Sequence, residues 1–87
     1  MTTEEDGFYA QADRDTLVQY TVYELPEDFP KHYVVRRWEV RRGGELVKTP
    51  FYRLGRTLEE ARELVPPGLF PLMRHPDDPK PIVETWT

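Results

Sequence analysis

The sequence contains no cysteine, no serine and no asparagine. Without cysteine, the chain can form neither a disulfide nor a thiolate metal site, and it has no cysteine nucleophile. The absence of serine excludes serine-based hydrolysis and group transfer, whatever the fold. Because the commonest covalent catalysts are missing, we predict a non-enzymatic protein that uses no cofactor.

Long apolar runs are missing as well. No stretch approaches the roughly 20 apolar residues of a membrane span, and the first ten residues, MTTEEDGFYA, lack the basic and apolar plan of a signal peptide. We therefore predict a cytoplasmic protein with no membrane partner. His32 and His75 lie far apart with no short ligand spacing, so we predict no metal site at these histidines and the aspartates near them.

Basic residues are scarce in the first third of the chain and acidic residues are scarce in the middle part, although the net charge is only −4. Residues 1–30 hold eight acidic residues against one basic residue, whereas residues 31–56 hold eight basic residues against two acidic ones. Blocks of opposite charge can pair within the fold or attract a charged partner. We favour pairing within the fold and keep the charged partner as the alternative.

The length of 87 residues predicts one domain. Residues 1–15 are acidic and hold only two aromatic side chains, Phe8 and Tyr9, which is the composition of a flexible tail. Phe8 and Tyr9 could still attach this tail to the domain. We predict a flexible acidic N-terminal tail over residues 1–15 and a single α+β domain over residues 16–87.

Two strands are predicted first, over residues 16–25 and 32–42. Both segments alternate with a period of two and are rich in β-branched and aromatic residues. In the second strand, Val34, Trp38 and Val40 share one face because successive side chains point to opposite sides of a sheet. We predict that this face meets the core.

A hairpin and a third strand follow. Gly43 and Gly44 predict the hairpin turn, because glycine readily adopts the positive φ that tight turns need. The third strand covers residues 45–54 and contains Pro50, which donates no hydrogen bond to a neighbouring strand. A proline of this kind is tolerated at an edge or a bulge, and we predict an edge strand.

One helix is predicted after the hairpin. Thr57 and Glu60 form a capping box, in which each side chain satisfies a free N–H group of the first turn. Four apolar residues recur at helical spacing and form the predicted buried stripe: Leu58, Ala61, Leu64 and Val65. The Pro66–Pro67 pair ends the helix.

The chain closes with a proline-rich segment and a short strand. Residues 66–81 hold six prolines, so we predict that they stay outside the sheet. Alternation over residues 82–86 predicts a last strand whose position in the sheet is left open. The result is a small antiparallel β–β–β–α–β sheet with one helix packed on a face.

Several short strings of the sequence resemble a family of small uncharacterised bacterial proteins. The strings are YTVY from Tyr20, DFP from Asp28, YVVRRW from Tyr33, PPGL from Pro66 and IVETW from Ile82. The chain departs from the family in its acidic tail and in Glu24–Leu25, where a more polar pair would be expected. The resemblance implies a compact bacterial protein, and it carries over no catalytic residue.

A set of basic and aromatic side chains forms the predicted binding surface. Its members are Tyr33, Arg36, Arg37, Trp38, Arg41, Arg42, Arg53, Phe70 and Trp86. We predict that they bind another protein together with the edge of the sheet, and a homodimer is one form of this hypothesis. The alternative is a nucleic-acid-binding protein that uses the basic hairpin of residues 31–56 for phosphate contacts and base stacking. Arg37 is assigned to the solvent face of the sheet.

Arg36 is unusual because alternation places it on the same face as Trp38, where an apolar residue is expected. Its stem can cover the rim of the core while its guanidinium reaches a carboxylate, and Glu84 is the predicted partner. The functional alternative is an arginine that recognises an anion in a pocket between Trp38 and Trp86.

The apolar residues of the proline-rich segment have two possible roles. They are Leu69, Phe70, Leu72 and Met73. They either fold back onto an open sheet face or stand out as a ligand for a partner. We favour coverage of the core, because a small domain has little apolar surface to spare.

Overall fold

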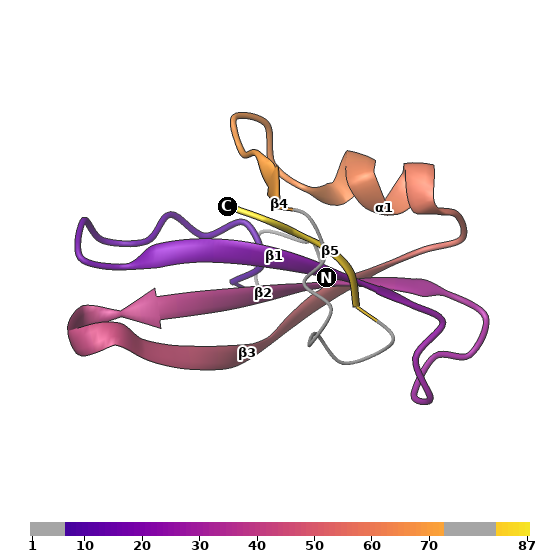
Figure 1. Cartoon of the computed structure of the whole chain (residues 1–87), viewed down its shortest axis with the longest axis horizontal. Coiled ribbons are helices and arrows are strands. Elements are labelled where there is room, and N and C mark those ends of the chain that lie inside the picture. The colour runs from indigo at the N-terminus through magenta and orange to yellow at the C-terminus, as the bar shows by residue number, and fades with distance from the viewer. Residues whose placement is uncertain (1–6, 73–81) are drawn as a thin grey trace.

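The computed structural model describes residues 7–72 and 82–87 and has the predicted α+β fold. Its elements are β1 (Leu17–Glu24), β2 (Tyr33–Arg41), β3 (Glu45–Gly55), α1 (Leu58–Leu64), β4 (Pro71–Leu72) and β5 (Ile82–Trp86). The strands form one open antiparallel sheet in the order β3-β2-β1-β5-β4. Helix α1 lies on one side of this sheet (Figure 1).

Strand β3 lies at the edge of the sheet, as Pro50 predicts. Its register with β2 shifts at a bulge, because Arg36 pairs with Tyr52 while Trp38 pairs with Lys48. Extra residues of β3 are accommodated there, and Pro50 is one of them. An edge strand tolerates both the bulge and the proline because one of its sides needs no partner.

The hairpin between β2 and β3 uses the two glycines as predicted, since Gly43 and Gly44 have φ values of 84° and 83°. Its loop is one residue longer than a two-residue turn. Arg41 pairs with Glu45, which leaves Arg42–Gly44 as a short 3-10 turn between the strands.

The C-terminal strand β5 pairs with β1, which places β1 in the middle of the sheet. The prediction that the proline-rich segment stays outside the sheet is wrong for Pro71 and Leu72. These residues form β4, with Pro71 opposite Trp86 and Leu72 opposite Thr85. A strand this short at the outer edge loses little from a proline, because no further strand requires its N–H group.

The face of the sheet that meets the core is the opposite of the predicted one. Val22 and Val35 are fully buried on the face that α1 covers, whereas Trp38 and Val40 lie half-buried on the other face. Val34 shares this other face and is only 3% exposed. Alternation separates the two faces of a strand, but the elements that later pack on the sheet decide which face is covered.

Helix α1 begins at the predicted cap. The Thr57 hydroxyl accepts the Glu60 N–H at 3.1 Å, and the Glu60 carboxylate accepts the Arg56 N–H at 2.9 Å. All four residues of the predicted apolar stripe pack in or against the core. The helix lies close to β3 because Gly55 has no side chain, and a Cβ there would stand 2.9 Å from the Ala61 nitrogen.

The N-terminal segment contributes to the core, since Phe8 is fully buried. Its ring makes edge contacts with Tyr9 and Tyr20, at centroid distances of 4.6 and 5.2 Å. The Tyr9 hydroxyl donates to the Leu64 carbonyl at 2.7 Å. Phe8 and Tyr9 therefore attach the segment to the domain, and the packed part of the chain begins before residue 16.

The apolar residues after α1 divide between the two roles that the sequence left open. Leu69 packs against the core, but Phe70 is 75% exposed and Leu72 is also exposed. The predicted core coverage is therefore wrong for Phe70 and Leu72, because both lie at the outer end of the sheet where no described element packs on them. Met73 lies outside the described residues. Within residues 7–72 and 82–87, no helix has the length and apolar character to cross a bilayer.

Candidate functional site

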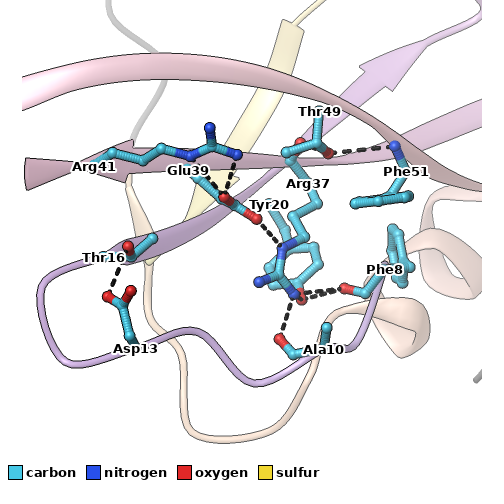
Figure 2. A network of polar contacts seen from close by, with 10 residues as sticks. All are labelled: Phe8, Ala10, Asp13, Thr16, Tyr20, Arg37, Glu39, Arg41, Thr49 and Phe51. Carbon is cyan, nitrogen blue, oxygen red and sulfur yellow. Dashed lines mark hydrogen bonds and ion pairs between the residues drawn. The ribbon is translucent and has the colours of Figure 1, made fainter. Parts of the chain in front are cut away.

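Arg37 lies at the middle of β2, on the face that α1 and the N-terminal segment cover. Its Nη1 donates to the carbonyls of Ala10 and Phe8 at 2.6 and 3.2 Å, with the Tyr20 hydroxyl at 3.4 Å (Figure 2). Only 2% of Arg37 is exposed, so its predicted place on the solvent face is wrong. The reason is the N-terminal segment, which covers this part of the face beside α1 and brings two backbone carbonyls to the guanidinium.

Glu39 holds two arginines together. Its Oε2 accepts Arg37 Nε at 3.0 Å, and its Oε1 accepts Arg41 Nε and Nη2 at 3.1 and 2.9 Å. Burial raises the pKa of the Glu39 carboxyl, but the hydrogen bonds and charges of Arg41 and Arg37 outweigh this and lower it below its usual range. The cluster of two arginines and one carboxylate carries a net positive charge at neutral pH.

Beside this cluster, the surface opens into a hollow of about 530 Å³ between β2 and the N-terminal segment. Its lining residues are Ala10, Gln11, Ala12, Asp13, Asp15, Thr16, Arg37, Glu39, Arg41 and Arg42. Asp13 shapes the outer wall, because its Oδ1 accepts the Thr16 hydroxyl and the Asp15 N–H, both at 3.0 Å. The hollow therefore has a basic wall from the hairpin and an acidic wall from residues 13–15.

The two charge blocks of the sequence meet at this hollow. Arg42 lies 3.8 Å from Asp15, and both side chains are largely exposed. Among the described residues, this is the one ion pair that joins the acidic block to the basic block. Such an exposed contact stabilises the fold little.

The other face of the sheet carries an apolar groove of about 340 Å³. Seven side chains line it: Gln19, Thr21, Tyr23, Trp38, Leu46, Ile82 and Thr85. The Trp38 Nε1 donates to the Tyr23 hydroxyl at 3.1 Å, which holds the two aromatic side chains together. Burial raises the pKa of Tyr23, although Trp38 and the charge of Arg36 act in the opposite direction.

Arg36 shares this open face with Trp38, but its predicted partner is wrong. Its Nη1 donates to the Thr49 carbonyl at 2.8 Å, and its guanidinium lies 5.2 Å from the centre of the Tyr52 ring. The Glu84 carboxylate instead binds Arg62, with N–O distances of 2.9 and 3.2 Å.

The predicted pocket between the two tryptophans does not form, because Trp38 and Trp86 lie on opposite faces. Thr21 pairs with both Arg36 and Thr85, so Thr85 is the β5 residue that shares the open face. Trp86 pairs with Tyr20 on the covered face, and its Nε1 donates to Glu84 at 3.0 Å. Alternation within one strand cannot reveal this, because the face that a residue shares with residues of another strand depends on the register between the two strands.

The remaining predicted site residues are also dispersed. Tyr33 packs against the core, and the Arg53 guanidinium lies 4.6 Å from the centre of the Phe8 ring on the same face. Arg41 and Arg42 lie at the hairpin end of the hollow, while Phe70 stands at the opposite edge of the sheet. The nine residues therefore do not form one surface.

Sequence reasoning missed two groups of residues. The groove residues of β1, Gln19, Thr21 and Tyr23, alternate along the chain, so their common face could have been recognised. Asp13 and its loop carried no comparable signal, because the loop was assigned to the tail. In the part of the chain that the structure describes, no three side chains are grouped to hold a metal ion, and His75 lies outside that part.

A comparison of the chain with known protein families, with curated proteins and with solved structures finds no match. The resemblance to a bacterial family therefore stays a prediction.

Proposed function

We propose that this chain is a non-enzymatic interaction module that binds another protein through the apolar groove beside Trp38. The observation that carries the proposal is the groove itself. Trp38, Tyr23, Leu46 and Ile82 line it, and none of the described elements packs over it. Apolar patches on a sheet face are typical of protein-binding surfaces, and tryptophan and tyrosine dominate binding energy at such interfaces.

The charges beside the groove favour one partner chemistry. Lys48 lies opposite Trp38 on β3, and Arg36 lies on the same face. The ion pairs between described residues involve Arg37, Arg41, Arg42 and Arg62, so neither Arg36 nor Lys48 takes part in one. Asp28 is the carboxylate that lines the same small pocket as these two basic residues, which leaves one net positive charge among the three. We infer a partner segment that combines bulky apolar side chains with aspartate or glutamate.

The edge of β3 adds a second element to this surface. Residues Glu45–Thr49 form the first part of this edge strand, and they include Leu46 and Lys48. An extended partner segment can pair with such an edge through backbone hydrogen bonds, but Pro50 and the bulge limit the pairing to a few residues. The partner therefore gains most of its affinity from the side chains that enter the groove.

The alternative of nucleic-acid binding through residues 31–56 has less support. Arg37 is buried, and Arg41 and Arg42 face carboxylates at the hollow, on the other side of the sheet from Arg36. The basic residues therefore do not follow one continuous path for a phosphate backbone. A labelled single-stranded oligonucleotide tests the alternative, which requires binding at low salt that weakens steeply as salt rises.

We propose that the protein is cytoplasmic. The main proposal is tested by selecting peptides from a random library that bind the intact protein. We expect the selected peptides to carry acidic residues next to bulky apolar ones. Lys48→Glu and Trp38→Gln should weaken their binding about tenfold or more. The control is Arg56→Glu, a charge reversal at an exposed arginine next to α1, which should leave binding unchanged.

The location of binding gives an independent check. In an amide NMR titration with a selected peptide, the largest shifts should fall on the residues of β1, β2, β3 and β5 that line the groove. Shifts confined to α1 would contradict the proposal, as would peptides whose binding ignores Lys48→Glu. Sedimentation of the free protein shows whether a second copy already occupies the groove.

A further inference from the structure

Arg37 has a donor that the fold does not use. In residues 7–72 and 82–87, its hydrogen bonds involve Nε and Nη1, and none involves Nη2. Figure 2 shows this second terminal nitrogen pointing away from Phe8, toward the side where Asp13 lies. Arg37 lines the hollow, so its unused N–H groups face that space. A guanidinium fixed on three sides presents its last nitrogen with little loss of side-chain entropy.

The hollow carries opposite charges on its two walls. The β2 wall holds Arg37 and Arg41 around the shared carboxylate of Glu39, which leaves one net positive charge before Arg42 is counted. The facing wall holds Asp13 and Asp15. The hydrogen bonds of Asp13 use its Oδ1 atom, so its charge is fixed in place while Oδ2 is available to a ligand.

A small ligand fits this hollow in size. Its volume of about 530 Å³ lies in the range of roughly 300–1,000 Å³ that is usual for small-molecule sites. A simple anion would satisfy Arg37 but would meet the repulsion of the two aspartates. A simple cation would satisfy the aspartates and leave the Arg37 nitrogen without a partner.

We propose that the hollow binds a small zwitterion of the α-amino-acid class. The ligand's carboxylate accepts hydrogen bonds from Arg37 Nη2, and its ammonium group lies against the carboxylates of Asp13 and Asp15. This site is separate from the groove beside Trp38, because it lies on the other face of the sheet. The proposal therefore does not depend on the proposed protein partner.

The test uses three probes on the intact chain: L-alanine, acetate and ethylammonium, at constant ionic strength. Binding is followed by NMR, using the backbone amides of residues 12–16 and the Arg37 Nε–H signal, which is held by Glu39. We expect L-alanine to shift these signals with one dissociation constant. Acetate and ethylammonium should each require about tenfold higher concentration, because each lacks one of the two charges.

Two variants separate the walls. Asp13→Asn keeps the oxygen that accepts from Thr16 and Asp15 but removes the negative charge. It should therefore weaken L-alanine binding about fivefold, whereas acetate binding should become slightly tighter because one repelling carboxylate is gone. The control Asp28→Asn, in the turn before β2, should change neither. Arg37→Lys should weaken the binding of both L-alanine and acetate. The NMR signals of residues far from the hollow show whether this variant is folded.

The proposal is overturned if no probe gives a saturable shift at these residues, or if acetate binds as tightly as L-alanine. It is also overturned if Asp13→Asn leaves L-alanine binding unchanged. This last comparison keeps the test decisive even where Arg37→Lys does not fold.

Discussion

The two faces of the sheet use the same strands in different ways. The covered face holds Phe8, Val22 and Val35 with no exposed surface, and it also buries the charged Arg37. The open face carries Trp38 and a more apolar set of β2 residues, and no described helix or strand packs over the groove beside Trp38, although Thr21 and Val34 on this face are buried. The difference shows that the cover decides which face becomes the core, and that a buried arginine is stable where backbone carbonyls and a carboxylate satisfy it.

The strongest test of this difference is the substitution Phe8→Ala. Phe8 is fully buried and contacts Tyr9, Tyr20 and Arg53. Its loss should lower the free energy of unfolding by about 3–5 kcal/mol, measured by chemical denaturation. The matched control is Phe70→Ala at the exposed edge, which should change it by less than about 0.5 kcal/mol. Equal effects of the two variants would show that Phe8 does not belong to the core.

Arg37→Met tests the polar part of the covered face. It leaves the carbonyls of Phe8 and Ala10 without their donor, and should lower the free energy of unfolding by about 2–4 kcal/mol. Because these bonds hold the N-terminal segment, trypsin should also cut faster after the exposed Arg14. Arg41→Met, which removes an exposed neighbour, is the control, and an unchanged cleavage rate in Arg37→Met would argue against the attachment.

The pH dependence of stability sharpens the contrast, since carboxylates with lowered pKa lie on the covered face. The folded pKa of Glu39 lies below its ordinary value of 4.5, so its contribution is complete above that value. The contribution is lost as pH falls through the lowered pKa. Glu39→Gln should lower the free energy of unfolding by about 1 kcal/mol at pH 7. In this variant, the free energy of unfolding should also fall less steeply as the pH is lowered. Denaturation curves from pH 7 to pH 3 measure this, with Glu59→Gln on α1 as the control.

The smallest effect is expected on the open face. Leu46 is 59% exposed beside Trp38, so Leu46→Ala should change the free energy of unfolding by less than about 0.5 kcal/mol. The same variant should weaken the selected peptides of the proposed function. A loss above 2 kcal/mol in thermal or chemical denaturation would mean that the groove is part of the core.

Much of the fold follows from local signals in the sequence. Alternation identifies three strands, Thr57 and Glu60 identify the start of α1, and Pro50 identifies the edge strand. Each of these signals depends on a residue and its near neighbours, so a single sequence contains the information. The short strand at Pro71 is the exception, because its pairing with Trp86 outweighs the local preference of proline.

The candidate sites could not be predicted in the same way. In β2, Val34, Trp38 and Val40 are more apolar than Tyr33, Val35 and Arg37 on the opposite face. Local patterning therefore favours the wrong face of β2 as the one that meets the core. The outcome depends on contacts between distant parts of the chain, such as those from the N-terminal segment to β2. The pairing of Glu84 likewise depends on the register of β5, which no residue of β5 reveals by itself.

The central position of β1 has a consequence for the order of folding. Its partner β2 follows after a short turn, and β3 follows β2, so these three strands can pair by closing short loops. Its other partner, β5, comes from the end of the chain, and Tyr20 meets Trp86 only after nearly the whole sequence has been brought together. We expect φ-values near zero for substitutions in β5 and higher values in the β2–β3 hairpin, and the reverse pattern would contradict this order.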